Sequence, residues 1–161
     1  MPRGVALMSS QVRRLGCDPG LSTGWALWNG TSLIDSGSVE GGVMGFIDWW
    51  HDWNIPSKVD EVVYERFIPA GFKGLSQVHS LQIEGALFAL WNGPTTGQLR
   101  AAKATLFRQH HEGDKGQTER KEWLASKGLK FETTHAMDAA THVLVERKNA
   151  KDMKFWHRYW K

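Results

Sequence analysis

The sequence predicts a mixed α/β domain in which a central five-stranded sheet is flanked by helices on both faces. Three observations indicate it: extended segments separated by turns open the chain, an amphipathic helical pattern follows, and helical and extended patterns then alternate. The length of 161 residues, with 41% hydrophobic and 23% charged residues, is typical of one compact domain. We therefore expect a folded domain over 12–149, a flexible leader over 1–11 and a C-terminal tail over 150–161.

Three strands are expected at the start of the domain. Segments 12–18 and 24–28 have extended character, and Asn29-Gly30 between two apolar runs is typical of a hairpin turn. We therefore expect 24–28 to pair antiparallel with 31–39, which gives a three-stranded meander.

A helix and a fourth strand follow. Apolar residues recur at spacings of three and four between Val43 and Trp53, which predicts an amphipathic helix that ends at Pro56. Segment 59–65 has the pattern of a buried strand. Because a strand–helix–strand unit forms a right-handed crossover, this strand is expected to run parallel to an earlier one.

The second half of the chain is predicted to be mainly helical. A long helix over 75–91 has two apolar sides, so it packs either on the sheet and a second subunit or deep within one subunit. The remaining predicted elements are an extended piece over 95–102, a helix over 118–127, a short edge strand over 129–133 and a helix over 135–148.

Composition and charge narrow the function classes. The single cysteine, Cys17, excludes a disulfide within the chain and favours a reducing compartment. No segment approaches the roughly 20 apolar residues of a membrane span, so we expect a soluble cytoplasmic protein with no membrane partner. Residues 147–161 carry six Lys and Arg against one Asp, a basic end that suits a polyanion such as nucleic acid.

Basic and aromatic residues are interleaved in the tail, which leaves two interpretations open. In the first, Lys154 and Arg158 neutralise DNA phosphates while the rings stack on bases. In the second, the tail is a closing helix whose aromatic side chains cover the core while the basic ones extend to solvent.

Four side chains are candidates for an active site. Asp18 ends the first strand and Glu65 ends the parallel one, so both carboxylates are expected at the same edge of the sheet. His135 and Asp138 share the first turn of the last helix. Each residue also has an ordinary interpretation, as a turn residue, an ion-paired surface residue or a helix cap. Converging carboxylates, however, are what divalent cations need in order to cleave a phosphodiester.

Three motifs resemble those of one enzyme family. Residues 17–26 resemble the opening motif of the RuvC family of Holliday-junction resolvases, 63–67 the second motif and 135–139 the third. The likeness extends from about Val12 to Val145 and implies a ribonuclease H-like fold. It also implies that Asp18, Glu65, His135 and Asp138 form a catalytic site for two Mg²⁺ ions, with Mn²⁺ as a substitute. His135 is then either a metal ligand or a water activator.

The resemblance also implies DNA contacts and a homodimer. Phe67 and Phe72 lie in a loop that inserts an aromatic near the junction crossover in the family, and Gln109 to Glu112 replace the family's Gly-rich turn. The residues expected to touch DNA are Phe67, Phe72, Lys73, Lys103, Lys115, Lys154 and Arg158.

The expected function is metal-dependent resolution of four-way DNA junctions. A homodimer would make paired symmetric nicks with 5′-phosphate and 3′-hydroxyl ends. Two alternatives stay open: a nuclease that also cuts flaps and forks, and a protein that binds junctions without cutting. The short chain and its nine tryptophans would suit a phage-encoded enzyme that acts in the bacterial host cytoplasm.

Overall fold

A computed structural model describes residues 11–68, 76–108 and 111–161; most of the expected leader lies outside them. Five strands form one sheet in the order β3-β2-β1-β4-β5. Neighbours pair antiparallel from β3 to β1 and parallel from β1 to β5. The predicted hairpin, meander and parallel crossover are confirmed. The strands are β1 (Arg13–Asp18), β2 (Thr23–Asn29), β3 (Ser32–Val39), β4 (Glu61–Glu65) and β5 (Thr95–Gln98).

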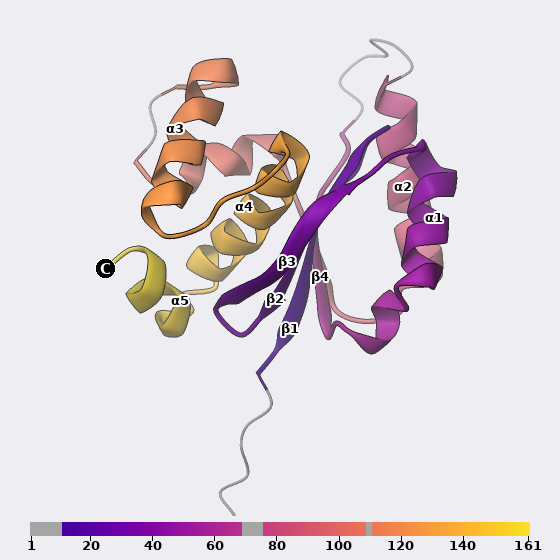
Figure 1. Ribbon diagram of the computed structural model, residues 1–161, viewed down its shortest axis with the longest axis horizontal. Helices are drawn as coiled ribbons and strands as arrows, with labels where there is room; N and C mark the ends of the chain where they lie inside the picture. Colours follow the sequence, from indigo (N-terminus) through magenta and orange to yellow (C-terminus); the bar gives the residue numbers. More distant parts are fainter. Residues whose placement is uncertain (1–10, 69–75, 109–110) are drawn as a thin grey trace, which may run out of the picture.

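Helices cover both faces of this sheet, as the sequence predicts. Figure 1 shows α1 and α2 on one face, and α4, with α3 and α5 beyond it, on the other. Two short 3-10 helices, η1 (Ile55–Ser57) and η2 (Arg100–Thr105), complete the fold. The α-helices are α1 (Gly42–Asp52), α2 (Ser76–Leu90), α3 (Gly113–Ser126), α4 (Thr134–Asn149) and α5 (Met153–Tyr159).

Each face of the sheet buries its own apolar core. Phe46 and Trp50 of α1 pack with Ile83 and Leu87 of α2 under one face. On the other face the core lies around α4, and the tail contributes to it, because Phe155 and Tyr159 of α5 contact Trp28 of β2. This packing matches the second interpretation of the tail, a closing helix over the core.

Four predictions about element limits differ from the structure. The helix expected to end at Pro56 ends at Asp52, and Pro56 lies in η1. Residues 129–133 form no strand, because the Leu129 N–H bonds back to the Leu124 carbonyl and Thr133 already caps α4. The extended piece over 95–102 is a strand only to Gln98, after which the chain turns into η2. The third α-helix begins at Gly113 rather than at Thr118. No helix in the described ranges is long and apolar enough to cross a membrane.

Candidate active site

Two of the candidate carboxylates lie side by side at one edge of the sheet. β1 and β4 run parallel, with Cys17 opposite Tyr64, so Asp18 and Glu65, the last residues of the two strands, lie next to each other. This arrangement follows from the crossover topology, because the carboxyl ends of adjacent parallel strands meet at the same edge. The placement expected from the sequence is confirmed.

Glycines let α4 lie directly on the strands that carry this edge. A Cβ on Gly24 would lie 1.9 Å from the His135 carbonyl oxygen, and a Cβ on Gly16 would lie 2.2 Å from that of Ala139. Any side chain at either position would therefore push the helix away. Thr133 fixes where the helix begins, because its side-chain oxygen accepts from the Ala136 N–H. Close packing thus brings the first turn of α4 to Asp18.

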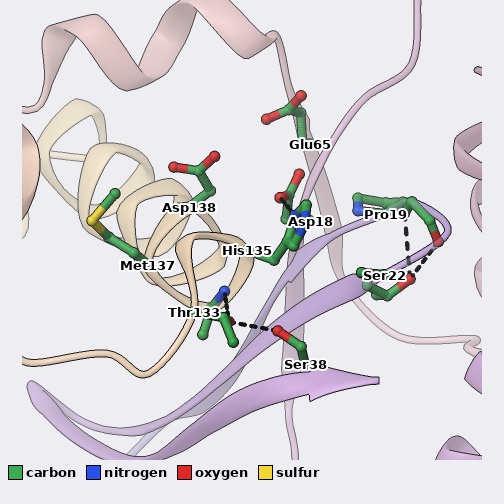
Figure 2. Close-up of polar contacts among 12 residues, drawn as sticks. Asp18, Pro19, Ser22, Ser38, Glu65, Thr133, His135, Met137 and Asp138 are labelled. Atoms are coloured by element: carbon green, nitrogen blue, oxygen red, sulfur yellow. Dashed lines mark hydrogen bonds and ion pairs between the residues drawn. The ribbon is translucent and has the colours of Figure 1, made fainter. Parts of the chain in front are cut away.

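Figure 2 shows the four candidate side chains around a common space. His135 contacts Asp18 directly, with Nδ1 3.2 Å from Asp18 Oδ2. The hydrogen bond to Asp18 raises the pKa of His135. Burial raises the pKa of Asp18, with a further contribution from the charges of Glu65 and Asp138, and it outweighs the lowering by His135. Three carboxylates that share one partly desolvated space repel one another, so a positive charge beside them is stabilising.

Lys103 supplies part of that charge. Its Nζ lies 2.8 Å from Asp138 Oδ2 and 3.1 Å from Glu65 Oε2, and the residue is only 6% exposed. Burial disfavours the ammonium form, but the charges of Asp138 and Glu65 outweigh it and raise the pKa of Lys103. The sequence predicts a DNA phosphate contact for Lys103. The structure places its ammonium group between two carboxylates instead.

Glu65 is kept in its ionised form by its neighbours. Burial by itself would raise its pKa, but the His142 hydrogen bond and the Lys103 charge lower the pKa of Glu65 to about 2. Asp138 is less completely paired: its Oδ1 is buried with no hydrogen-bond partner among the described residues, and Arg120 lies 3.7 Å away. An unpartnered buried carboxylate oxygen is costly, so it marks a place where a cation fits.

The site opens into a cleft of about 780 Å³. Residues 19–22 form one wall, and Arg66, Phe67 and Arg100 lie elsewhere along it. The four candidate residues and Lys103 also line it. A phosphodiester backbone placed in this cleft therefore meets both arginine side chains and the carboxylates.

The donor set suits a hard divalent cation once Lys103 moves. No three His, Cys, Asp or Glu side chains in the described part of the chain are spaced to hold a metal as they stand. Asp18, Glu65 and Asp138 nevertheless offer carboxylate oxygens around one space, which is the ligand type that Mg²⁺ and Mn²⁺ prefer. The three carboxylates therefore have the chemistry of ligands for a divalent metal, although the Lys103 ammonium group lies between Glu65 and Asp138.

The solved structures that are similar to this chain include two of RuvC. RuvC from Thermus thermophilus is 16% identical, with a TM-score of 0.55 over 91% of this chain and 96% of that one. T. thermophilus RuvC in complex with a Holliday junction substrate is 13% identical, with a TM-score of 0.60 over the same shares. The chain has a RuvC-like fold. No protein-family model and no curated protein matches it.

The residues expected to touch DNA are not all near this site. Phe67 lines the cleft, and its N–H donates to Glu84. Lys115 lies on α3, where its Nζ is 3.1 Å from His111 Nε2. Phe72 and Lys73 lie outside the described residues.

The tail cations lie at the other end of the RuvC-like sheet. Arg158 donates to the side chains of Thr31 and Ser32, beside the turn that joins β2 to β3. This turn adjoins the start of β1, whereas Asp18 ends β1. Lys154 is on the same short helix as Arg158. The structure therefore does not bring either of them to the carboxylates.

Two buried groups at the site, a guanidinium and an imidazole, were not predicted from the sequence. Arg120 faces Asp138 from α3, and His142 contacts Glu65 from α4. A signal for His142 existed in the spacing, because it follows Asp138 by four residues and so lies one helical turn along the same face.

Proposed function

We propose that the protein is a metal-dependent endonuclease that resolves four-way DNA junctions. One observation carries the proposal: Asp18, Glu65 and Asp138 come from three separate elements and converge in one cleft. The RuvC-like fold supports the choice of substrate, since one of the similar proteins was solved on a Holliday junction. A basic C-terminal end is consistent with a nucleic-acid partner.

In this proposal the carboxylates of Asp18, Glu65 and Asp138 hold two Mg²⁺ ions, for which Mn²⁺ substitutes. When bound, such ions polarise the phosphate and lower the pKa of the attacking water. His135 is half exposed at the rim, with Nδ1 engaged by Asp18, so Nε2 is the nitrogen that exchanges a proton with water. Arg66 and Arg100 neutralise the phosphates on either side. In-line attack of this water on phosphorus would break the P–O3′ bond, and protonation of the departing oxygen would leave a 5′-phosphate and a 3′-hydroxyl.

Paired symmetric nicks require two such sites, and we propose a homodimer through α2. Ile83 and Leu87 are fully buried against the core, whereas Leu81 and Phe88 are 51% and 57% exposed. α2 thus packs on its own subunit through one side and presents large apolar side chains on the other. The proposed partner of that exposed side is a second copy of the chain.

Cleavage of a labelled four-way junction with Mg²⁺ or Mn²⁺ tests the proposal. The native protein is compared with Asp18→Asn, and with Asp35→Asn as a control that removes an exposed carboxylate of β3. Symmetric nicks confined to the junction, abolished by Asp18→Asn and kept by Asp35→Asn, are the expected result. Equal cutting of flaps or forks would indicate a broader nuclease. Tight junction binding without cutting under either metal would contradict the enzymatic proposal.

A further inference from the structure

Beyond the four candidate residues, a chain of buried polar groups lies behind Glu65. Glu65 and Gln98 end neighbouring strands and are direct partners in the β4–β5 register. His142 of α4 lies against both: its Nε2 is 2.9 Å from Glu65 Oε2, and its Nδ1 is 2.9 Å from the Gln98 side-chain amide. The His142 side chain is completely buried, and Gln98 is only 9% exposed.

The orientation of the Gln98 amide determines which nitrogen of His142 carries the proton. With its nitrogen toward His142, the amide donates to Nδ1 at 2.9 Å and to the His142 carbonyl at 3.1 Å, and its oxygen accepts from the Glu146 N–H at 3.1 Å. The opposite orientation leaves the oxygen facing acceptors and the nitrogen facing donors. Since Nδ1 accepts, the ring proton lies on Nε2. His142 therefore donates to Glu65.

These bonds fix the carboxylate on one side. His142 and Lys103 both end on Glu65 Oε2. Oε1 takes part in neither bond, so it is the oxygen that a cation can take without breaking the contact with His142. Among the groups that hold Oε2, Lys103 is on a flexible four-carbon side chain, whereas His142 is a rigid ring inside the core. When Lys103 moves, His142 keeps the carboxylate in place.

We propose that His142 and Gln98 are positioning residues that hold the Glu65 carboxylate ready for a divalent cation. Gln98 fixes the ring tautomer, and His142 Nε2–H fixes Oε2. The inference rests on the proposed function, since it concerns the same metal site. Hydrogen-bond partners of ligating carboxylates typically contribute about 10–100-fold to metal affinity.

Two substitutions at position 142 separate this role from simple core packing. The amide nitrogen of His142→Gln reaches the place of Nε2 and keeps a donor for Glu65. The shorter His142→Asn places its amide near Nδ1, so it keeps the contact with Gln98 and loses the one with Glu65. Mn²⁺ binding to the full-length protein, measured by electron paramagnetic resonance, is expected to weaken about 10–100-fold in His142→Asn and to stay within about threefold in His142→Gln. Metal-free melting curves establish that each variant is folded under the assay conditions.

The outcomes are distinguishable. If the native protein binds Mn²⁺ and the two folded variants bind it equally well, His142 is a packing residue and the inference is wrong while the proposed function stands. If the native protein binds no Mn²⁺, the proposed metal site fails and the inference fails with it. Nitrogen-15 chemical shifts of His142 provide a second test: protonation at Nε2 supports the inference, and protonation at Nδ1 alone overturns it.

Discussion

Gly16→Ala is expected to separate the two halves of the candidate active site. The added Cβ would lie 2.2 Å from the Ala139 carbonyl oxygen and 2.9 Å from Val143 Cγ2, whereas real Cβ contacts essentially never fall below 3.0 Å. Since the atom met first is backbone, α4 must retreat from β1 by about 1 Å. Asp138 precedes Ala139, so it moves away from Asp18. A misplacement of about 1 Å costs roughly 100-fold in rate, which is about 2.7 kcal/mol of activation free energy.

The assay compares junction cleavage at saturating Mg²⁺ with the melting temperature of the same variant. Overpacking at Gly16 is expected to lower the free energy of unfolding by about 1–3 kcal/mol. Val63→Ala is the matched control, because Val63 of β4 is buried in the same core as α4. Truncating Val63 is expected to lower the free energy of unfolding by a comparable amount, about 1–3 kcal/mol, but it leaves a cavity rather than a clash. The control is expected to cleave within a few-fold of the native rate.

A folded Gly16→Ala protein with native cleavage would refute this reasoning. It would mean that the spacing between α4 and β1 does not set the geometry of the carboxylates. An equal loss of rate in Val63→Ala would also refute it, because general destabilisation would then account for both results. The comparison is made below the melting temperature of the weaker variant.

Three further outcomes are expected. Lys103→Met should lower the metal-free melting temperature, because removing one partner of a buried ion pair costs about 3–5 kcal/mol. Adding Mg²⁺ should then raise the melting temperature of the variant by more than that of the native protein. An equal rise in both proteins, measured by calorimetry, would contradict this. Leu81→Glu should convert a dimer to a monomer on a sizing column, and a dimer of native size would contradict the α2 interface. Asp18→Asn should lower the pKa of His135 in an NMR titration. Because Asp18 raises the pKa of His135, the contact between them stabilises the folded protein below pH 6.5, the pKa of an unfolded histidine. This stabilisation is lost as the pH rises through the higher pKa of His135 in the folded protein.

The fold was predictable because local signals agreed with long-range packing. The hairpin at Asn29-Gly30 and the crossover from 12–18 to 59–65 are both as expected, and together they define the edge where Asp18 and Glu65 meet. The strand expected over 129–133 was wrong because an apolar residue such as Leu129 looks the same in a sequence whether it enters a sheet or only packs under a helix.

The site was only partly predictable because charge compensation is a three-dimensional property. The acidic candidates share strand ends and a helix start, which patterns reveal. The groups that balance them come from η2, α3 and the middle of α4, where nothing in the local sequence separates a buried Lys103 or Arg120 from a solvated one. Their burial appears only when the elements pack. The roles assigned to the candidate residues therefore stay predictions until the variants are measured.

The pairing of these charges differs between the two sides of the site, which bears on how a cation enters. Glu65 and Asp138 share the buried Lys103, while the one ion pair of Asp18 within the described ranges is with His135, whose side chain is 50% exposed. A cation that approached Asp18 would compete with a half-solvated imidazole, whereas one held by Glu65 and Asp138 would have to displace an ammonium group that contacts both carboxylates. Since breaking a buried pair costs far more than breaking an exposed one, the Asp18 side is the easier entry. Lys103 is the counter-charge that keeps three neighbouring carboxylates compatible with a folded protein, and it is the group that the proposed metal would replace.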